Sequence, residues 1–74
     1  MFDRWPVYER VLVNLIDGSA IDGLLIARRG ALLVITDATL LTDDHEPARL
    51  DGEVFVERSR VLFIQSRGHP PVLP

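Results

Sequence analysis

The chain has 74 residues, a formal net charge of −3, 47% hydrophobic residues and 26% charged residues. This length allows one small domain, which buries only about 60% of the surface that its unfolded chain exposes. The apolar content excludes a disordered chain, which needs few apolar residues and a high net charge. No apolar run approaches the roughly 18 residues of a membrane helix. The first residues lack the pattern of a secretion signal, so we expect no membrane association.

The chain contains no cysteine, which excludes disulfides and thiolate metal sites. A domain this small usually needs a disulfide, a metal or partner chains to be stable. We therefore expect no cofactor and no metal, and we expect partner chains, beginning with other copies of this chain.

All eight basic residues are arginine. A GC-rich genome is the simpler explanation of this composition, and a selective use of the planar, bidentate guanidinium at interfaces is compatible with it. The negative total charge is not typical of a general nucleic-acid-binding protein.

The first half of the chain carries strand signals. Apolar residues alternate with a period of two over 10–16, and Asp17-Gly18-Ser19 marks a tight turn. A second strand is predicted over 20–28. Gly23 in its middle indicates a bulge or a sharp bend.

The later elements follow the same pattern. In chain order they are a turn at 29–30, a strand over 31–36 that 38–41 extends, a polar loop over 42–49, and strands over 52–57 and 60–65 joined by Arg58-Ser59. Five short strands favour a small all-β barrel or a strongly bent antiparallel sheet. A helix over 24–35 is the alternative. Gly23, Gly30 and the β-branched residues argue against it.

The apolar surplus points to assembly. Leu32-Leu33-Val34-Ile35 is continuous, so both faces of that strand are expected to be buried. The open edges of an incompletely closed barrel also present unpaired backbone groups. Pairing of edge strands between subunits solves both problems. The barrel residues predicted at this partner interface are Val54, Val56, Val61 and Phe63.

Both ends of the chain differ from the barrel. Residues 1–9 hold Phe2, Trp5 and Tyr8, and residues 66–74 hold Pro70 and Pro71, which favour an extended, polyproline-like chain. We divide the chain into an aromatic arm (1–9), a barrel (10–65) and a Pro-rich arm (66–74). The arms are either frayed tails or partner anchors. We expect anchors, so these five residues complete the predicted interface.

From about residue 10 to residue 65 the pattern resembles the Sm-like (LSm) family. The resemblance rests on Val11-x-Val13-x-Leu15-x-Asp17-Gly18-Ser19, Ile21-x-Gly23-x-Leu25, Leu33-Val34-Ile35-x-Asp37-Ala38, Gly52-Glu53-Val54-Phe55-Val56 and Val61-Leu62-Phe63-Ile64. It implies an N-terminal helical segment before five strongly bent antiparallel strands. It also implies rings of five to seven subunits, closed by pairing the fourth strand with the fifth of a neighbour.

The chain departs from the RNA-binding members of that family. Those members carry an Asp and an Asn before the third strand, where this chain has Arg28 and Leu32. Their second signature contains Arg-Gly, where this chain reads Val56-Glu57-Arg58-Ser59-Arg60, with Glu57 at the basic position. The resemblance therefore implies the fold without most of the base-binding residues, and a fold alone does not carry function.

A looser resemblance links Trp5-Pro6-Val7-Tyr8-Glu9, Leu50-Asp51-Gly52-Glu53-Val54 and the all-Arg composition to small structural proteins of tailed phages of actinobacteria. It implies a minor capsid or decoration protein that binds the major capsid protein. Such a protein is located in the virion after assembly in the host cytoplasm. Otherwise a cytoplasmic location is expected.

No residue pattern indicates an enzyme. His45 and His69 have no evident nucleophile partner, and no serine lies in a Gly-x-Ser-x-Gly turn. The acidic loop over 43–46 lacks the alternating oxygen ligands of a calcium site. We therefore predict no catalytic residue.

Four arginines form the candidate anion or nucleic-acid patch: Arg28, Arg29, Arg58 and Arg60. In the Sm-like arrangement they lie in loops near the ring axis, although pairing with surface carboxylates is an equally ordinary role for them. The main hypothesis is a non-catalytic virion assembly protein that binds neighbours through edge strands and arms. The alternative hypothesis is an Sm-like RNA-binding ring.

Overall fold

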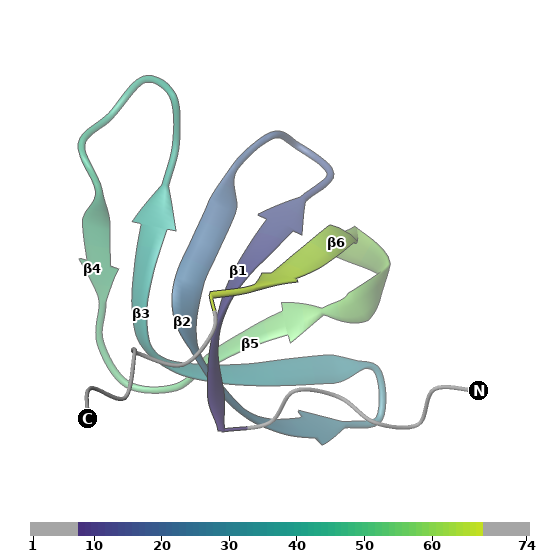
Figure 1. The fold of residues 1–74 in the computed structure, drawn as a ribbon. Coiled ribbons are helices and arrows are strands. Elements are labelled where there is room, and N and C mark those ends of the chain that lie inside the picture. Colours follow the sequence, from purple (N-terminus) through teal and green to yellow (C-terminus); the bar gives the residue numbers. More distant parts are fainter. Residues whose placement is uncertain (1–7, 68–74) are drawn as a thin grey trace, which may run out of the picture.

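The computed structural model describes residues 8–67, which form six antiparallel strands and one short 3₁₀ helix (Figure 1). The elements are β1 (Glu9–Leu15), β2 (Ala20–Arg29), β3 (Leu32–Leu41), β4 (Ala48–Leu50), β5 (Val54–Glu57), the 3₁₀ helix η1 (Arg58–Arg60) and β6 (Val61–Ser66). The strands follow the order β4-β3-β2-β1-β6, and β5 also pairs with β3. Within the described part of the chain, no helix has the length and apolarity needed to cross a membrane.

This architecture confirms the predicted all-β, strongly bent antiparallel barrel. The third strand runs through Asp37 to Leu41, as the pattern indicated. The turn after β2 lies at Gly30 and Ala31, one residue later than predicted, so Arg29 ends a strand. The predicted arms lie almost wholly outside the described residues, and Glu9 already belongs to β1.

The strand predicted over 52–57 is present as β5, and an additional short strand, β4, precedes it. β4 pairs with 38–40 and β5 pairs with 32–35, so both lie along the same partner strand, β3. Three residues, 51–53, interrupt the ladder, and Gly52 there has a φ of 76°. The polar loop was predicted to reach Arg49, which is wrong because Ala48–Leu50 pairs with β3. The sequence of residues 48–50 carries no strand signal of its own, because these residues form a strand only through pairing with β3.

The predicted bend in β2 is confirmed at Gly23. The ladder between β2 and β3 shifts register between Asp22 and Leu24. A Cβ at position 23 would lie 2.5 Å from Ile35 Cγ2 and 3.0 Å from the Thr36 carbonyl oxygen. The absent side chain therefore lets β2 bend closely onto β3.

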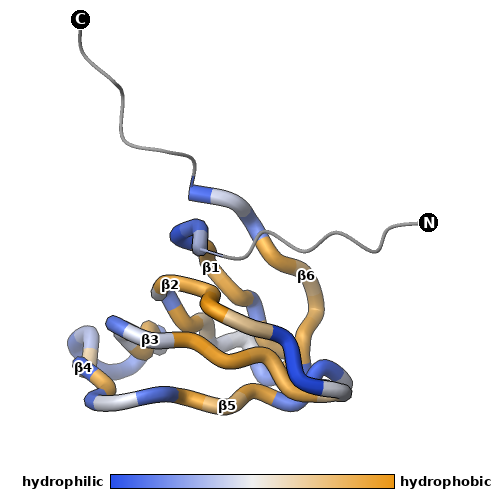
Figure 2. The backbone as a smooth tube through the Cα atoms, turned by 90° about the horizontal axis from the view of Figure 1, so that it is seen from below, coloured by the Kyte–Doolittle hydropathy of each residue, from blue (hydrophilic) through white to orange (hydrophobic). Residues whose placement is uncertain are grey.

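The inward side chains of β1, β2, β3 and β5 build one apolar core. Its buried members are Val11, Val13, Ile21, Leu25, Leu33, Ile35, Ala38 and Val56. Apolar stretches run along each of these strands and along β6 (Figure 2). In β3 three consecutive side chains are buried, Leu33, Val34 and Ile35. This confirms that both faces of that strand are covered.

A charged cluster ties three strands together outside the core. The Arg10 Nη1 group of β1 donates to Asp37 Oδ2 at 2.7 Å, and Arg49 of β4 donates to Asp37 Oδ1. Arg10 Nη2 also donates to the Asp37 carbonyl oxygen at 3.0 Å. Asp37 has a φ of 52°, a region that Asp and Asn tolerate better than most residues. The two guanidinium groups lower the pKa of the Asp37 carboxyl.

We predict that Gly23→Ala destabilises the protein by about 2–3 kcal/mol, because overpacking forces Ile35 and the β3 backbone to move. Gly52→Ala is the matched control. It meets no atom within 4 Å and carries only the cost of a positive φ, about 1 kcal/mol. Urea unfolding followed by circular dichroism measures both changes. Equal losses in the two variants would contradict the close approach at Gly23.

A second prediction concerns pH. A carboxyl whose folded pKa is lowered contributes stability above its ordinary pKa of 3.8, and this contribution disappears as pH falls through the lowered value. Asp37→Asn keeps the tolerance for positive φ and removes the titration. We therefore expect wild-type protein to lose more stability than Asp37→Asn between about pH 5 and pH 2. Urea unfolding at both pH values measures these losses. Equal losses of stability in wild-type protein and Asp37→Asn would disprove this role.

Candidate assembly and nucleic-acid surfaces

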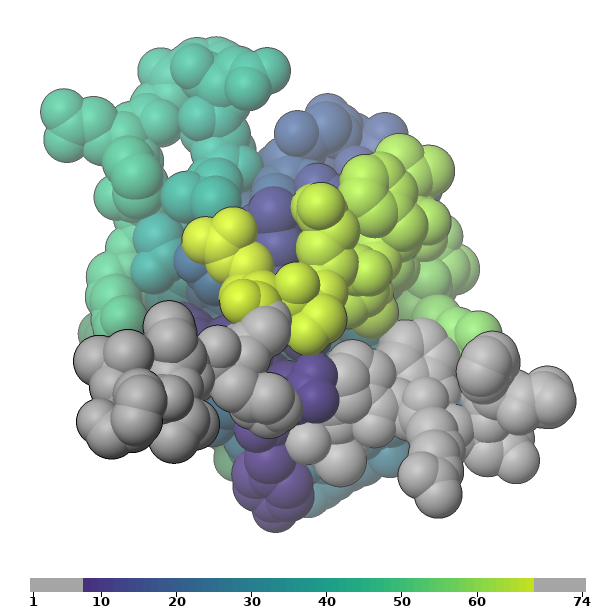
Figure 3. Space-filling view, viewed as in Figure 1, coloured from purple at the N-terminus to yellow at the C-terminus, as the bar shows by residue number. Residues whose placement is uncertain are grey.

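The two strands flanking η1 each have one unpaired edge. β5 pairs with β3 and β6 pairs with β1, and within residues 8–67 neither has a second partner. All strand pairs formed by residues 8–67 are antiparallel. β6 lies at the surface of the molecule (Figure 3). The unused donors and acceptors of both edges are therefore available to another strand.

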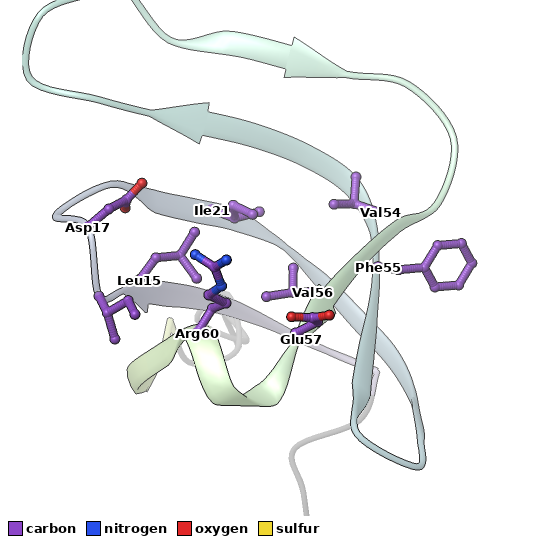
Figure 4. Close-up of a pocket in the computed structure, with 9 residues that line it drawn as sticks. Leu15, Asp17, Ile21, Val54, Phe55, Val56, Glu57 and Arg60 are labelled. Carbon is purple, nitrogen blue, oxygen red and sulfur yellow. The ribbon is translucent and has the colours of Figure 1, made fainter.

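An apolar groove follows the open edge of β5; we call it the β5 groove. It has a volume of about 260 Å³ and lies between β5, the β1–β2 turn and η1 (Figure 4). Its lining residues are Leu15, Ile16, Asp17, Ile21, Val54, Phe55, Val56, Glu57 and Arg60. Three charged groups thus border an otherwise apolar surface, and the Arg60 guanidinium extends into the groove (Figure 4).

A second groove, the β6 groove, follows the other edge strand. It also has a volume of about 260 Å³ and is lined by Arg58, Val61, Leu62, Phe63 and Ile64. Leu62 is 64% exposed and Phe63 is 50% exposed. The register between β1 and β6 shifts at this point, which leaves Leu62 without a partner on β1. The bulge explains why two successive apolar side chains face outward.

The predicted barrel interface residues all line one of these grooves. Val54 and Val56 lie in the β5 groove, whereas Val61 and Phe63 lie in the β6 groove. Val56 is a core residue with 6% exposure, so only a small part of its side chain reaches the groove. The predicted residues Phe2, Trp5, Pro70 and Pro71 lie outside the described part. Their contacts therefore remain predictions.

Sequence reasoning missed three exposed apolar residues. Phe55 is 53% exposed, and Ile16 and Leu62 also face outward. Phe55 follows from period two, because Val54 and Val56 point into the barrel and the residue between them must point out. Tyr8 was named in advance and is exposed. The β6 bulge that exposes Leu62 has no signal in the sequence.

The predicted arginine patch divides into two parts. Arg28 and Arg29 end β2, and the Arg58 N–H donates to the Ala31 carbonyl oxygen at 2.7 Å, which joins η1 to the β2–β3 turn. Arg60 instead lies in the β5 groove with Asp17. The backbone thus brings three arginines to one end of the barrel and leaves the fourth beside the β1–β2 turn.

Adjacent arginines of β2 face opposite sides of the sheet. Arg28 is in register with Leu33, a core residue, and Arg29 is in register with Leu32, whose other neighbour is Glu57. Successive strand residues point to opposite faces. Arg28 and Arg29 therefore flank the turn on two sides, and each faces a different part of the solvent.

The β1–β2 turn fixes the carboxylate of Asp17. The Ser19 hydroxyl donates to Asp17 Oδ1 at 2.6 Å and the Ser19 backbone N–H donates at 2.9 Å. These bonds lower the Asp17 pKa, and the positive charge of Arg60 lowers it further by a smaller amount. The Ile16 N–H also donates to the Arg60 carbonyl oxygen at 2.9 Å. The turn and η1 are thus held together.

The polar loop between β3 and β4 does not gather a ligand set. Asp43, Asp44, His45 and Glu46 are all exposed. No three His, Asp or Glu side chains among residues 8–67 are placed to share a metal ion. His69 lies outside the described part of the chain.

Comparisons with known proteins place this geometry in context. No family model matches the sequence, and no curated protein matches it. Solved structures do match. A Pyrococcus abyssii Sm protein in complex with a uridine heptamer is 28% identical, with a TM-score of 0.71, over 81% of this chain and 84% of that chain.

Two further solved structures are similar to the same extent. A heptameric archaeal Sm protein, described with implications for the eukaryotic snRNP core, is 28% identical over 84% of this chain and 90% of that chain, with a TM-score of 0.70. The P. aerophilum SmAP1 heptamer is 28% identical over 85% of this chain and 84% of that chain, with a TM-score of 0.71.

These likenesses correct the main functional hypothesis. The virion reading is wrong, because the similar structures are Sm proteins that form heptamers or hold RNA, and nothing in them points to a phage. One segment that suggested a phage protein, 50–54, is the bend between β4 and β5 and belongs to the barrel itself. The chain therefore has the Sm-like fold, and these solved structures support its resemblance to the Sm-like family.

Proposed function

We propose that the chain assembles into a ring and that the ring binds single-stranded RNA without catalysing a reaction. In this ring, β5 of each subunit pairs with β6 of the next. The observation that carries the proposal is that both edges are unpaired and each is bordered by an apolar groove. The similar Sm proteins include two heptamers and a complex with a uridine heptamer, which supports both parts.

Edge pairing relieves two costs at once. It satisfies the backbone donors and acceptors along β5 and β6. It also buries Phe55, Leu62 and Phe63, each of which is at least half exposed in the single chain. Full burial of a Leu or Phe side chain contributes about 1.5–3 kcal/mol. Since each subunit offers two different edges, the contact is head-to-tail, and such contacts close into rings when the rotation fits.

The proposed RNA site is the end of the barrel where η1 meets the β2–β3 turn. The backbone places Arg28, Arg29 and Arg58 at this end of the barrel, with their side chains on different sides, and a ring repeats them around its axis. This concentrates positive charge on a chain whose net charge is −3. Guanidinium groups bind phosphates through paired hydrogen bonds and stack on bases.

Arg28 and Leu32 stand where the RNA-binding members of the family carry an Asp and an Asn. Neither a leucine nor a guanidinium can accept a hydrogen bond from a base. The RNA is therefore held mainly through its phosphates, with little preference among bases.

Leu62→Ser tests the assembly. We expect the variant subunit to keep its fold, because Leu62 is largely exposed, and to associate about tenfold more weakly at each contact. Native mass spectrometry and light scattering over a range of concentrations measure this. Leu41→Ser, a half-buried position outside both grooves, is the control. Wild-type protein that stays monomeric at every concentration would contradict the ring.

Titration of a labelled oligouridine at about 50 and 200 mM salt tests RNA binding. We expect affinity to fall steeply with salt, with a slope of about −0.7 for each phosphate neutralised. Arg29→Ala is expected to weaken binding and flatten this slope. Arg67→Ala, at the far end of β6, is expected to change neither. Absence of binding at low salt would end this part of the proposal, and a strong preference for one base would overturn the phosphate mode.

A further inference from the structure

The charges bordering the two grooves are complementary. The β5 groove carries Asp17, Glu57 and Arg60, a net charge of −1, while the β6 groove carries Arg58. We propose that Glu57 of each subunit forms an ion pair with Arg58 of the neighbouring subunit, and that this pair selects head-to-tail contact. The inference rests on the proposed ring and names the residues that specify its contact.

Antiparallel pairing brings these two residues together. Glu57 is the last residue of β5, and β6 begins at Val61, directly after η1. When β5 of one subunit lies antiparallel to β6 of another, as in every strand pair formed by residues 8–67, the end of β5 faces the start of β6. Glu57 therefore faces η1 of the neighbour, where Arg58 lines the β6 groove.

Glu57 is available for this contact. Its side chain is exposed, and it makes no hydrogen bond or ion pair with any other residue between 8 and 67. Arg60 borders the same groove, and its charge helps to lower the pKa of Asp17 of its own subunit. Glu57 is the carboxylate that lies at the end of the open β5 edge, where a neighbouring strand would pair.

The same charges oppose the wrong contacts. In an antiparallel pair of two β5 edges, Glu57 faces the start of the other β5, beside the acidic Glu53. In a pair of two β6 edges, Arg58 faces the far end of the other β6, beside the basic Arg67. Like charges at a contact cost free energy, and neither symmetric contact forms the ion pair. The pair therefore disfavours symmetric dimers, which would use up the edges without closing a ring.

Reciprocal charge reversal tests the proposal. Glu57→Arg makes both grooves positive, and Arg58→Glu makes both negative, so each variant alone is expected to assemble about tenfold more weakly or worse. An equimolar mixture of the two variants restores opposite charges at every contact between unlike subunits, which is all contacts of an even-numbered ring and all but one of an odd-numbered ring. The double variant restores them at all contacts. Both are expected to assemble at concentrations close to those of wild-type protein. Native mass spectrometry identifies the mixed assemblies by mass.

Glu53→Arg is the matched control, since Glu53 is exposed, lies just before β5 and borders neither groove. It is expected to assemble as wild type does. Circular dichroism of each variant verifies that the subunit is folded. If wild-type protein forms rings and both single variants form them equally well, the ion pair is wrong while the ring stands. Single variants that fail without rescue in the mixture or the double variant would also overturn it. If wild-type protein never assembles, the proposed ring itself fails.

Discussion

The close approach of β2 to β3 at Gly23 is the constraint on which the rest of the barrel depends. A Cβ there would collide with Ile35 and with the β3 backbone, so only glycine lets the two longest strands bend together. The bend turns β3 so that its two halves face different directions. β4 lies along one half and β5 along the other, with 51–53 absorbing the change. This bend therefore places both β4 and β5.

The open edges are a consequence of the same geometry. β5 is fixed on β3 and β6 is fixed on β1, and the three residues of η1 join them. Backbone hydrogen bonds from Ile16 and Arg58 hold η1 against the turns on either side. Among residues 8–67 each of these two strands therefore keeps one unpaired edge. The placement of β5, η1 and β6 therefore creates both grooves. It also brings the backbone of Arg28, Arg29 and Arg58 to the same end of the barrel.

Much of this fold follows from local patterns in the sequence. Period two over 10–16, Asp17-Gly18-Ser19 and the mid-strand Gly23 were each sufficient to place their element. The continuous apolar run at 32–35 indicated burial on both faces, which holds for 33–35, while Leu32 is half-buried. β4 was beyond reach, because its three residues become a strand only through pairing with β3. The bulge in β6 was equally hidden, since it arises from a register shift against β1.

Side-chain direction at the candidate site was also beyond prediction from the sequence. Four arginines looked like one patch because their loops converge in the fold, but side-chain direction separates them. Arg28 and Arg29 face opposite sides of β2, and Arg60 extends into the β5 groove. The interface valines were found as apolar strand residues, yet alternation turns Val54 and Val56 inward and leaves Phe55 outside. Spacing identifies which residues share an element, whereas direction depends on register and bulges.

The departures from the family's RNA signature acquire meaning once these directions are known. At position 28, in register with the core residue Leu33, this chain has an arginine, which can donate but not accept hydrogen bonds, where RNA-binding members of the family carry an Asp. At position 32 a leucine pairs with Arg29 on one side and Glu57 on the other, within the ladder that leads to the β5 edge. Glu57, which occupies the basic position of the second signature, is placed to serve the contact between subunits. In the proposed ring, Arg28 supplies charge for phosphates at one end of the barrel, and Glu57 supplies charge for self-recognition at its edge.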